Sequence, residues 1–110
     1  MKVNILGVEY EIIESTEAKD PKLNGKDGYC DTTIKICVVE NMEESKKDLN
    51  AKKDLEEYKK SVKRHELIHA FLYESGLDCC SNWATNEEMV DFFAIQFPKM
   101  LKAFQDVEAL

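Results

Sequence analysis

The segment His65-Glu66-Leu67-Ile68-His69 constrains this chain more than any other, because it holds both of its histidines four positions apart. It lies in the run Glu43 to Ser75, which has no proline or glycine and is rich in helix-forming residues. Positions four apart share one face of a helix, so the two imidazoles can converge on one ion. Zinc accepts imidazole ligands, and Glu66 is placed to take a proton from a water at the open coordination position. We therefore predict that His65 and His69 bind zinc and that Glu66 is a general base.

A chance match is the alternative to be weighed. A histidine on an amphipathic helix is more often packed or solvated than bound to metal. With histidine at roughly one residue in fifty, however, a chain of this length should contain this pattern only about a few times in a thousand. A metal site is therefore favoured over a purely structural role for the two histidines.

A third ligand must come from a carboxylate or a thiolate, because a catalytic zinc uses three protein ligands and no histidine remains. Glu87 lies 18 residues after His69, in the first turn of a predicted helix, and Asp91 follows one turn later on the same face. We expect Glu87 to bind zinc and Asp91 to accept a hydrogen bond from a zinc-bound histidine. Glu88 is the main alternative ligand and Asp91 the next.

The N-terminal part of the chain predicts strands. Lys2 to Leu6 and Glu9 to Ile13 alternate apolar and polar residues around a glycine, which is typical of a hairpin. The turn-rich stretch Ser15 to Gly28 predicts a surface loop, and the β-branched stretch Thr32 to Val39 predicts a third strand. We therefore predict an α+β fold in which about three antiparallel strands support the histidine helix and a C-terminal glutamate helix.

The histidine helix should end at Gly76, and the run before it fits one helix or two that meet near Asp48-Leu49-Asn50. The next stretch, Leu77 to Ala84, predicts a compact connection. It contains Trp83, the only tryptophan, whose large ring is expected to anchor the core rather than to line a cleft.

The last helix has its own start signal. Thr85 to Glu88 matches a capping box, and the apolar residues after it recur at helical spacing. Proline cannot donate a backbone hydrogen bond inside a helix, so this helix should bend or stop near Pro98.

Length and charge limit the classes of function. With 110 residues the chain has room for one domain, residues 1–110. Its net charge is −7, from 22 acidic and 15 basic residues. Such a balance argues against binding to nucleic acid or to an anionic membrane, since both carry negative charge.

The chain is expected to be cytoplasmic. Its N-terminus becomes polar at Glu9 before a signal region could form, and no apolar run approaches the length of a membrane span. Because the cytoplasm is reducing, the four cysteines should be thiols. A zinc site made of all four is disfavoured, because they form no C-x-x-C pair; they are Cys30, Cys37, Cys79 and Cys80.

The two motifs, His65 to His69 and Asn86-Glu87-Glu88-Met89-Val90-Asp91, together resemble the H-E-x-x-H and N-E-x-x-x-D motifs of gluzincin metallopeptidases, of which thermolysin is a familiar member. The small size, and the run Glu87 to Pro98 with Phe93-Ala94 inside it, are closer to the compact ImmA/IrrE-like peptidases, often phage-borne, and to the minigluzincins. The resemblance covers about residues 30 to 98.

The resemblance implies one zinc per chain on His65, His69 and Glu87, with Glu66 as general base and Asp91 supporting His65. It also implies that Thr32 to Val39 is the edge of the cleft, along which an extended protein or peptide substrate would add as another strand.

The leading hypothesis is thus a zinc-dependent endopeptidase, in which Glu66 assists attack of a zinc-bound water on a peptide bond. One alternative is a catalytically weak zinc-binding interaction module of phage or prophage type, and another is a structural protein without metal. A peptidase also needs a second group, besides zinc, that stabilises the oxyanion. Tyr29, Tyr58 and Tyr73 are the candidates, and the sequence does not separate them.

Overall fold

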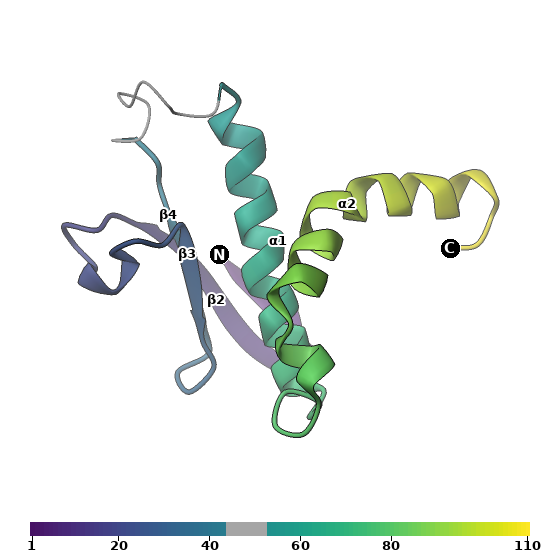
Figure 1. Cartoon of the computed structure of the whole chain (residues 1–110), viewed down its shortest axis with the longest axis horizontal. Coiled ribbons are helices and arrows are strands. Elements are labelled where there is room, and N and C mark those ends of the chain that lie inside the picture. The colour runs from purple at the N-terminus through teal and green to yellow at the C-terminus, as the bar shows by residue number, and fades with distance from the viewer. Residues whose placement is uncertain (44–52) are drawn as a thin grey trace.

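A four-stranded mixed sheet, two long helices and two short 3-10 helices make up the computed structural model, which describes residues 1–43 and 53–110. Figure 1 shows α1 (Leu55–Glu74) running between the sheet and α2 (Glu87–Asp106). The fold is α+β, as predicted. The possible junction of two helices near Asp48 lies outside the described residues.

The sheet has the strand order β1-β2-β4-β3. β1 (Lys2–Ile5) and β2 (Val8–Ser15) form the predicted antiparallel hairpin, whose turn contains Gly7 at a φ of 92°. β4 (Ile36–Glu40) pairs parallel with β2, and β3 (Gly28–Asp31) pairs antiparallel with β4. The prediction of about three antiparallel strands was wrong in strand number and in the orientation of the β2–β4 pair.

The predicted strand Thr32 to Val39 is only half a strand. Residues 32–35 form the turn that joins β3 to β4, because the Asp31 carboxylate accepts a hydrogen bond from the Thr33 N–H at 3.0 Å, and Lys35 adopts a φ of 61°. Such a local side-chain bond competes with strand pairing and overrides the β propensity of threonine. Since β4 lies inside the sheet, the edge strand is β3 rather than the predicted Thr32 to Val39.

Two buried clusters join α1 to one face of the sheet. In one, Val62 packs against Val39 and Met42. In the other, Ala70 packs with Ile5, Tyr10 and Cys37. The small side chain of Ala70 is fully buried, so the helix lies close to the strands at this point. Removing such contacts from water supplies the main driving force that fixes α1 on the sheet.

Both ends of α1 have local stop signals. At its start the Asp54 carboxylate accepts a hydrogen bond from the Glu57 N–H at 3.0 Å, which satisfies one of the unpaired amides of the first turn. At its end Gly76 adopts a φ of 84° and donates to the Tyr73 carbonyl at 3.0 Å. Gly76 therefore ends the helix, as predicted, because a left-handed residue costs glycine little.

The connection between the helices differs from the prediction at Trp83. This ring lies in the short helix η3 (Asn82–Thr85) and is 53% exposed, so it does not anchor the core. Its neighbour Ala84 does, packed with Leu72 and Val90. The order of residues in the single turn of η3 points the small side chain inward and leaves the large one at the surface.

α2 begins one residue later than the capping box predicted. The Asn86 side chain accepts a hydrogen bond from the Met89 N–H at 2.8 Å, so Asn86 is the N-cap and Glu87 the first helical residue. The helix continues through Pro98 and changes direction about midway, as Figure 1 shows. Proline leaves the Ala94 carbonyl without its helical donor, and the Arg64 Nε of α1 donates to that carbonyl at 2.5 Å instead. Neither described long helix combines the length and apolarity needed to cross a membrane.

Candidate metal centre

His65, His69 and Glu87 bring three possible metal ligands together between α1 and α2. The Nε2 atoms of His65 and His69 lie 3.2 Å apart, and the Glu87 carboxylate lies 3.1 Å from each of them, through Oε2 and Oε1 respectively. Within residues 1–43 and 53–110, these are the histidine, cysteine and acidic side chains found close enough to share an ion. The predicted set thus meets at one point, and the alternative ligand Glu88 lies outside it.

Asp91 holds the other ring nitrogen of His65. Its Oδ1 lies 2.8 Å from Nδ1, and because a carboxylate only accepts hydrogen bonds, we assign the proton to Nδ1. The Nε2 of His65 then presents a lone pair to the Glu87 carboxylate at 3.1 Å. Two electron-rich atoms at this distance repel each other unless a proton or a metal ion lies between them. Histidines that bind metal commonly donate their other ring N–H to a carboxylate in this way.

The donor spacing and chemistry fit zinc. Ligands bound at about 2.0 to 2.2 Å in a tetrahedron lie about 3.3 to 3.6 Å from one another. The two histidine nitrogens, 3.2 Å apart, are within a few tenths of an ångström of that spacing. The two distances of 3.1 Å to Glu87 involve different carboxylate oxygens, and with one ligand atom from each residue the three donors lie within 4.8 Å of one another. Two imidazoles and one carboxylate also match the ligand types of catalytic zinc, whereas calcium and magnesium prefer oxygen ligands alone.

Glu66 lies beside the three donors and is buried. Its side chain is 7% exposed, and its Oε1 is 3.8 Å from the His65 Nε2. Burial raises the pKa of Glu66 to about 7; the charge of Glu87 adds to this rise, while the electrostatic interactions of Glu66 with His65 and Lys26 oppose it. A carboxyl group with a pKa near neutrality can accept a proton and later return it, which is what a general base and acid must do.

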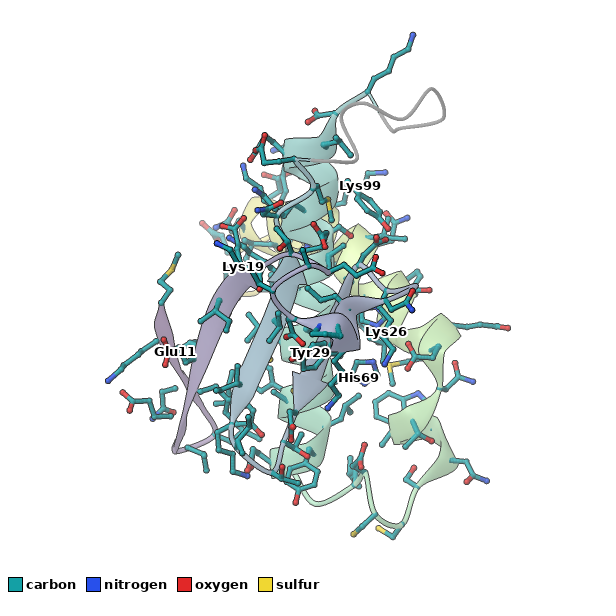
Figure 2. All side chains as sticks on the ribbon, turned by 90° about the vertical axis from the view of Figure 1, so that its left-hand side faces the viewer. Glu11, Lys19, Lys26, Tyr29, His69 and Lys99 are labelled. Carbon is teal, nitrogen blue, oxygen red and sulfur yellow. The ribbon has the colours of Figure 1, made fainter. Side chains whose placement is uncertain are left out.

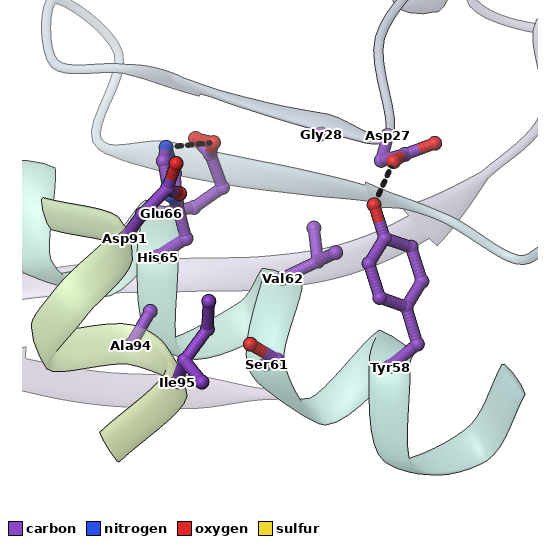
Figure 3. Close-up of a pocket in the computed structure, with 10 residues that line it drawn as sticks. All are labelled: Asp27, Gly28, Tyr58, Ser61, Val62, His65, Glu66, Asp91, Ala94 and Ile95. Carbon is purple, nitrogen blue, oxygen red and sulfur yellow. Dashed lines mark hydrogen bonds and ion pairs between the residues drawn. The ribbon is translucent and has the colours of Figure 1, made fainter. Parts of the chain in front are cut away.

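Two cavities of about 520 Å³ each flank the centre, and His65 and Glu66 line both. Figure 3 shows the first, with these two residues and Asp91 at one end and Tyr58 with Asp27 at the other. Apolar side chains also line this cavity; they are Val62, Ala94 and Ile95. This half of the cleft is therefore suited to an apolar group.

The second cavity is more polar and contains the rest of the donor set, His69 and Glu87. Figure 2 shows Lys26 and Tyr29 near His69, and all three line this cavity. Its remaining walls include Tyr73 and Asp78. Polar and charged groups of a bound molecule would find partners on this side.

The three candidate tyrosines differ in their hydroxyl partners. Tyr29 donates to Asp20, and Tyr58 donates to Asp27. The bond to Asp20, with burial, raises the pKa of Tyr29 to about 12, and burial, with the bond to Asp27, raises that of Tyr58 to about 12. Both hydroxyl protons are thus held by carboxylates. Tyr73 lines the second cavity, and the Lys35 Nζ lies 4.9 Å from its ring centroid.

The sequence does not single out Gly28, which lies at the end of the predicted surface loop Ser15 to Gly28. A Cβ atom there would meet the Val38 oxygen at 2.9 Å, Val62 Cγ1 at 3.0 Å and Glu66 Cγ at 3.3 Å. Only glycine therefore lets the edge strand β3 lie directly against Glu66. The sequence feature that could have identified Gly28 is its position where the loop ends, directly before Tyr29 and Cys30.

The cysteines lie in two places, and all four are free. Cys30 and Cys37 face each other across the β3–β4 pair, with their Sγ atoms 3.4 Å apart. Cys37 is buried, whereas Cys79 and Cys80 are exposed just after α1. None of them belongs to the donor group of His65, His69 and Glu87.

Comparison of the chain with protein-family models, with curated proteins and with solved structures gave no match. The resemblance to gluzincins therefore rests on the motif residues themselves. The metal centre is inferred from the distances, burial and hydrogen bonds described above.

Proposed function

We propose that this chain is a zinc-dependent peptidase whose metal is held by His65, His69 and Glu87. One observation carries the proposal: the Nε2 atoms of His65 and His69 lie 3.2 Å apart, and each lies 3.1 Å from an oxygen of the Glu87 carboxylate, beside the buried Glu66. Bound zinc would supply Lewis acidity, which lowers the pKa of water and polarises a carbonyl group. A centre of this kind suits hydrolysis better than a purely structural role, because it leaves one coordination position open.

Glu66 is the proposed proton carrier. It takes a proton from the attacking water and delivers it to the amine that leaves when the peptide bond breaks. Its burial supports this role, since a buried carboxyl group accepts a proton more readily than an exposed one. Asp91 holds His65 through Nδ1, so that Nε2 stays directed at the metal position.

An extended peptide is the proposed substrate. β3 is an edge strand next to Glu66, so its free backbone groups can pair with a peptide that enters between β3 and α2. The two cavities lie on either side of Glu66, where the side chains flanking the cleaved bond would be placed. The peptide could thus extend past the centre in both directions, which favours internal cleavage.

A zinc-binding interaction module is the second candidate. The hydrogen bonds of Tyr29 and Tyr58 to carboxylates favour it, because these hydroxyl groups are then less able to stabilise an oxyanion. Such a module would bind a partner segment along β3 and release it intact.

Glu66→Gln separates the two candidates, because it removes the proton carrier and leaves all three proposed ligands. With a library of quenched peptides and zinc-loaded protein, we expect turnover to fall about 100- to 10,000-fold. Zinc content and peptide binding should be unchanged. Glu88→Gln makes the same substitution at an exposed position outside the donor group and should behave like the wild type. Equal turnover in Glu66→Gln and wild type, or no turnover in either, would refute the peptidase.

A further inference from the structure

Among the described residues that line the two cavities, Lys26 is the only lysine or arginine. The other charged residues of the lining are all acidic, apart from the histidines; they are Asp27, Glu66, Asp78, Glu87 and Asp91. A single cation in a cleft of this composition cannot serve to attract acidic substrates over a distance, because the surrounding field is negative. The charge of Lys26 therefore acts only on groups that lie next to its ammonium.

The loop before β3 determines where Lys26 lies. Leu23 is buried and anchors this loop, and the Lys26 N–H donates to the Leu23 carbonyl at 2.9 Å. Gly25 adopts a φ of 72° between them, which turns the chain towards the cleft. Two residues later Gly28 packs against Glu66. Lys26 therefore lines the polar cavity together with Glu66 and His69, and Figure 2 shows Lys26 near His69.

We propose that the Lys26 ammonium stabilises the negative charge that develops on the carbonyl oxygen of the cleaved peptide bond. This role rests on the proposed function. When water attacks, a C–O bond forms, the π electron pair of the carbonyl moves to its oxygen, and a water proton goes to Glu66. When the C–N bond breaks, that electron pair re-forms the carbonyl and the amine takes the proton from Glu66. Lys26 donates hydrogen bonds and keeps its protons throughout.

Lys26 meets the requirement better than Tyr29 and Tyr58 do. A lysine ammonium has three donors and a full charge, whereas Tyr29 and Tyr58 donate to carboxylates. Lys26 and Glu66 also line the same cavity. The cation and the proton carrier thus face the same space, where the carbonyl oxygen and the attacking water would meet.

The test compares Lys26→Met and Lys26→Arg with the wild type, all loaded with zinc. On peptides with blocked ends, Lys26→Met should lose about 100-fold in kcat with KM nearly unchanged, because the oxyanion exists only in the transition state. Lys26→Arg should restore most of kcat. A phosphonamidate peptide, whose tetrahedral anion mimics the transition state, should bind Lys26→Met about 100-fold more weakly than wild type, at equal zinc content.

Lys19→Met is the matched control, since it removes the same charge from an exposed position of the same loop outside both cavities. It should keep wild-type kcat. Unchanged kcat and phosphonamidate affinity in Lys26→Met would overturn the role of Lys26 while leaving the peptidase standing. An effect on KM alone, limited to peptides with a free carboxylate, would also overturn it and make Lys26 an anchor for that group. A zinc-loaded wild type without turnover would overturn the proposed function itself.

Discussion

The two helices contribute to the candidate centre in different ways. The side chains from α1 are largely enclosed: Glu66 is 7% exposed, and His65 and His69 are each 20% exposed. The side chains from α2 lie near the surface, with Glu87 64% and Asp91 60% exposed. The side chains from α1 are therefore held in place by the core, and those from α2 are held by their contacts with the side chains from α1.

This difference in exposure predicts which property of the protein each substitution should change. α1 is packed against the sheet along much of its length, so its site residues owe their chemistry to burial. α2 is held mainly through Val90 and Ala94, and none of its side chains beyond Ala94 is buried. Substitutions on α1 should therefore change the stability of the metal-free fold, and those on α2 should change metal affinity.

The largest expected effect is on α1, in the metal-free protein. Folding raises the pKa of Glu66 from 4.5 to about 7, so the native state holds this proton more tightly than the unfolded chain. The resulting stability is fully present below pH 4.5 and is lost as the pH rises through 7, a change of about 3 kcal/mol. The glutamine of the Glu66→Gln variant has no ionisable proton, so its contribution to stability does not change with pH. Without metal it should be more stable than wild type by up to about 3 kcal/mol at pH 8, and similar to it at pH 4.

Urea unfolding of both proteins in a chelator at the two pH values measures this difference. Saturating zinc should narrow the gap at pH 8, because a cation next to Glu66 offsets the cost of its buried charge. Equal stability of the two metal-free proteins at pH 8 would mean that burial does not raise the pKa of Glu66.

A smaller effect is expected on α2. Asp91→Asn keeps the shape of the side chain but removes the charge that holds the His65 Nδ1–H, so zinc affinity should fall about 10- to 100-fold. Competition with a chelating dye measures this affinity. Because Asp91 is exposed, the metal-free stability should change by less than about 0.5 kcal/mol.

Glu88→Gln is the control for Asp91→Asn, since it removes a negative charge from the same helix at an exposed position. It should leave zinc affinity within about twofold of wild type, because exposed charges are screened. Equal losses in the two variants would show that α2 acts only through its overall charge. The claim that individual side chains of α2 determine zinc affinity would then be wrong.

The parts of the centre that the sequence predicts are those set by local spacing. His65 and His69 share a face because they are four apart on a helix, and Glu87 and Asp91 share one for the same reason. To predict each pair, it is enough to predict the helix that carries it. The meeting of the two helices could be expected only through the resemblance to gluzincins, because the contacts that join them come from residues far apart, such as Leu72 and Val90.

The sheet could not be predicted to the same extent. β3 has four residues and begins with Gly28, so it is too short for an alternating pattern. The parallel β2–β4 pair places Ile12 opposite Cys37, and nothing near either residue in the sequence indicates that pairing. Lys26 was missed for a related reason. A lysine in a turn-rich loop has no distinguishing pattern until the packing of Gly28 on Glu66 brings that loop to the cleft.

The central claim is that one zinc joins the two helices through His65, His69 and Glu87. X-ray absorption at the zinc edge of protein loaded with one equivalent tests it most directly. We predict one zinc per chain with nitrogen and oxygen ligands at about 2.0 to 2.2 Å, including two imidazoles, and no sulfur. A zinc–sulfur distance of about 2.3 Å, or no bound zinc after removal of excess metal, would contradict the account.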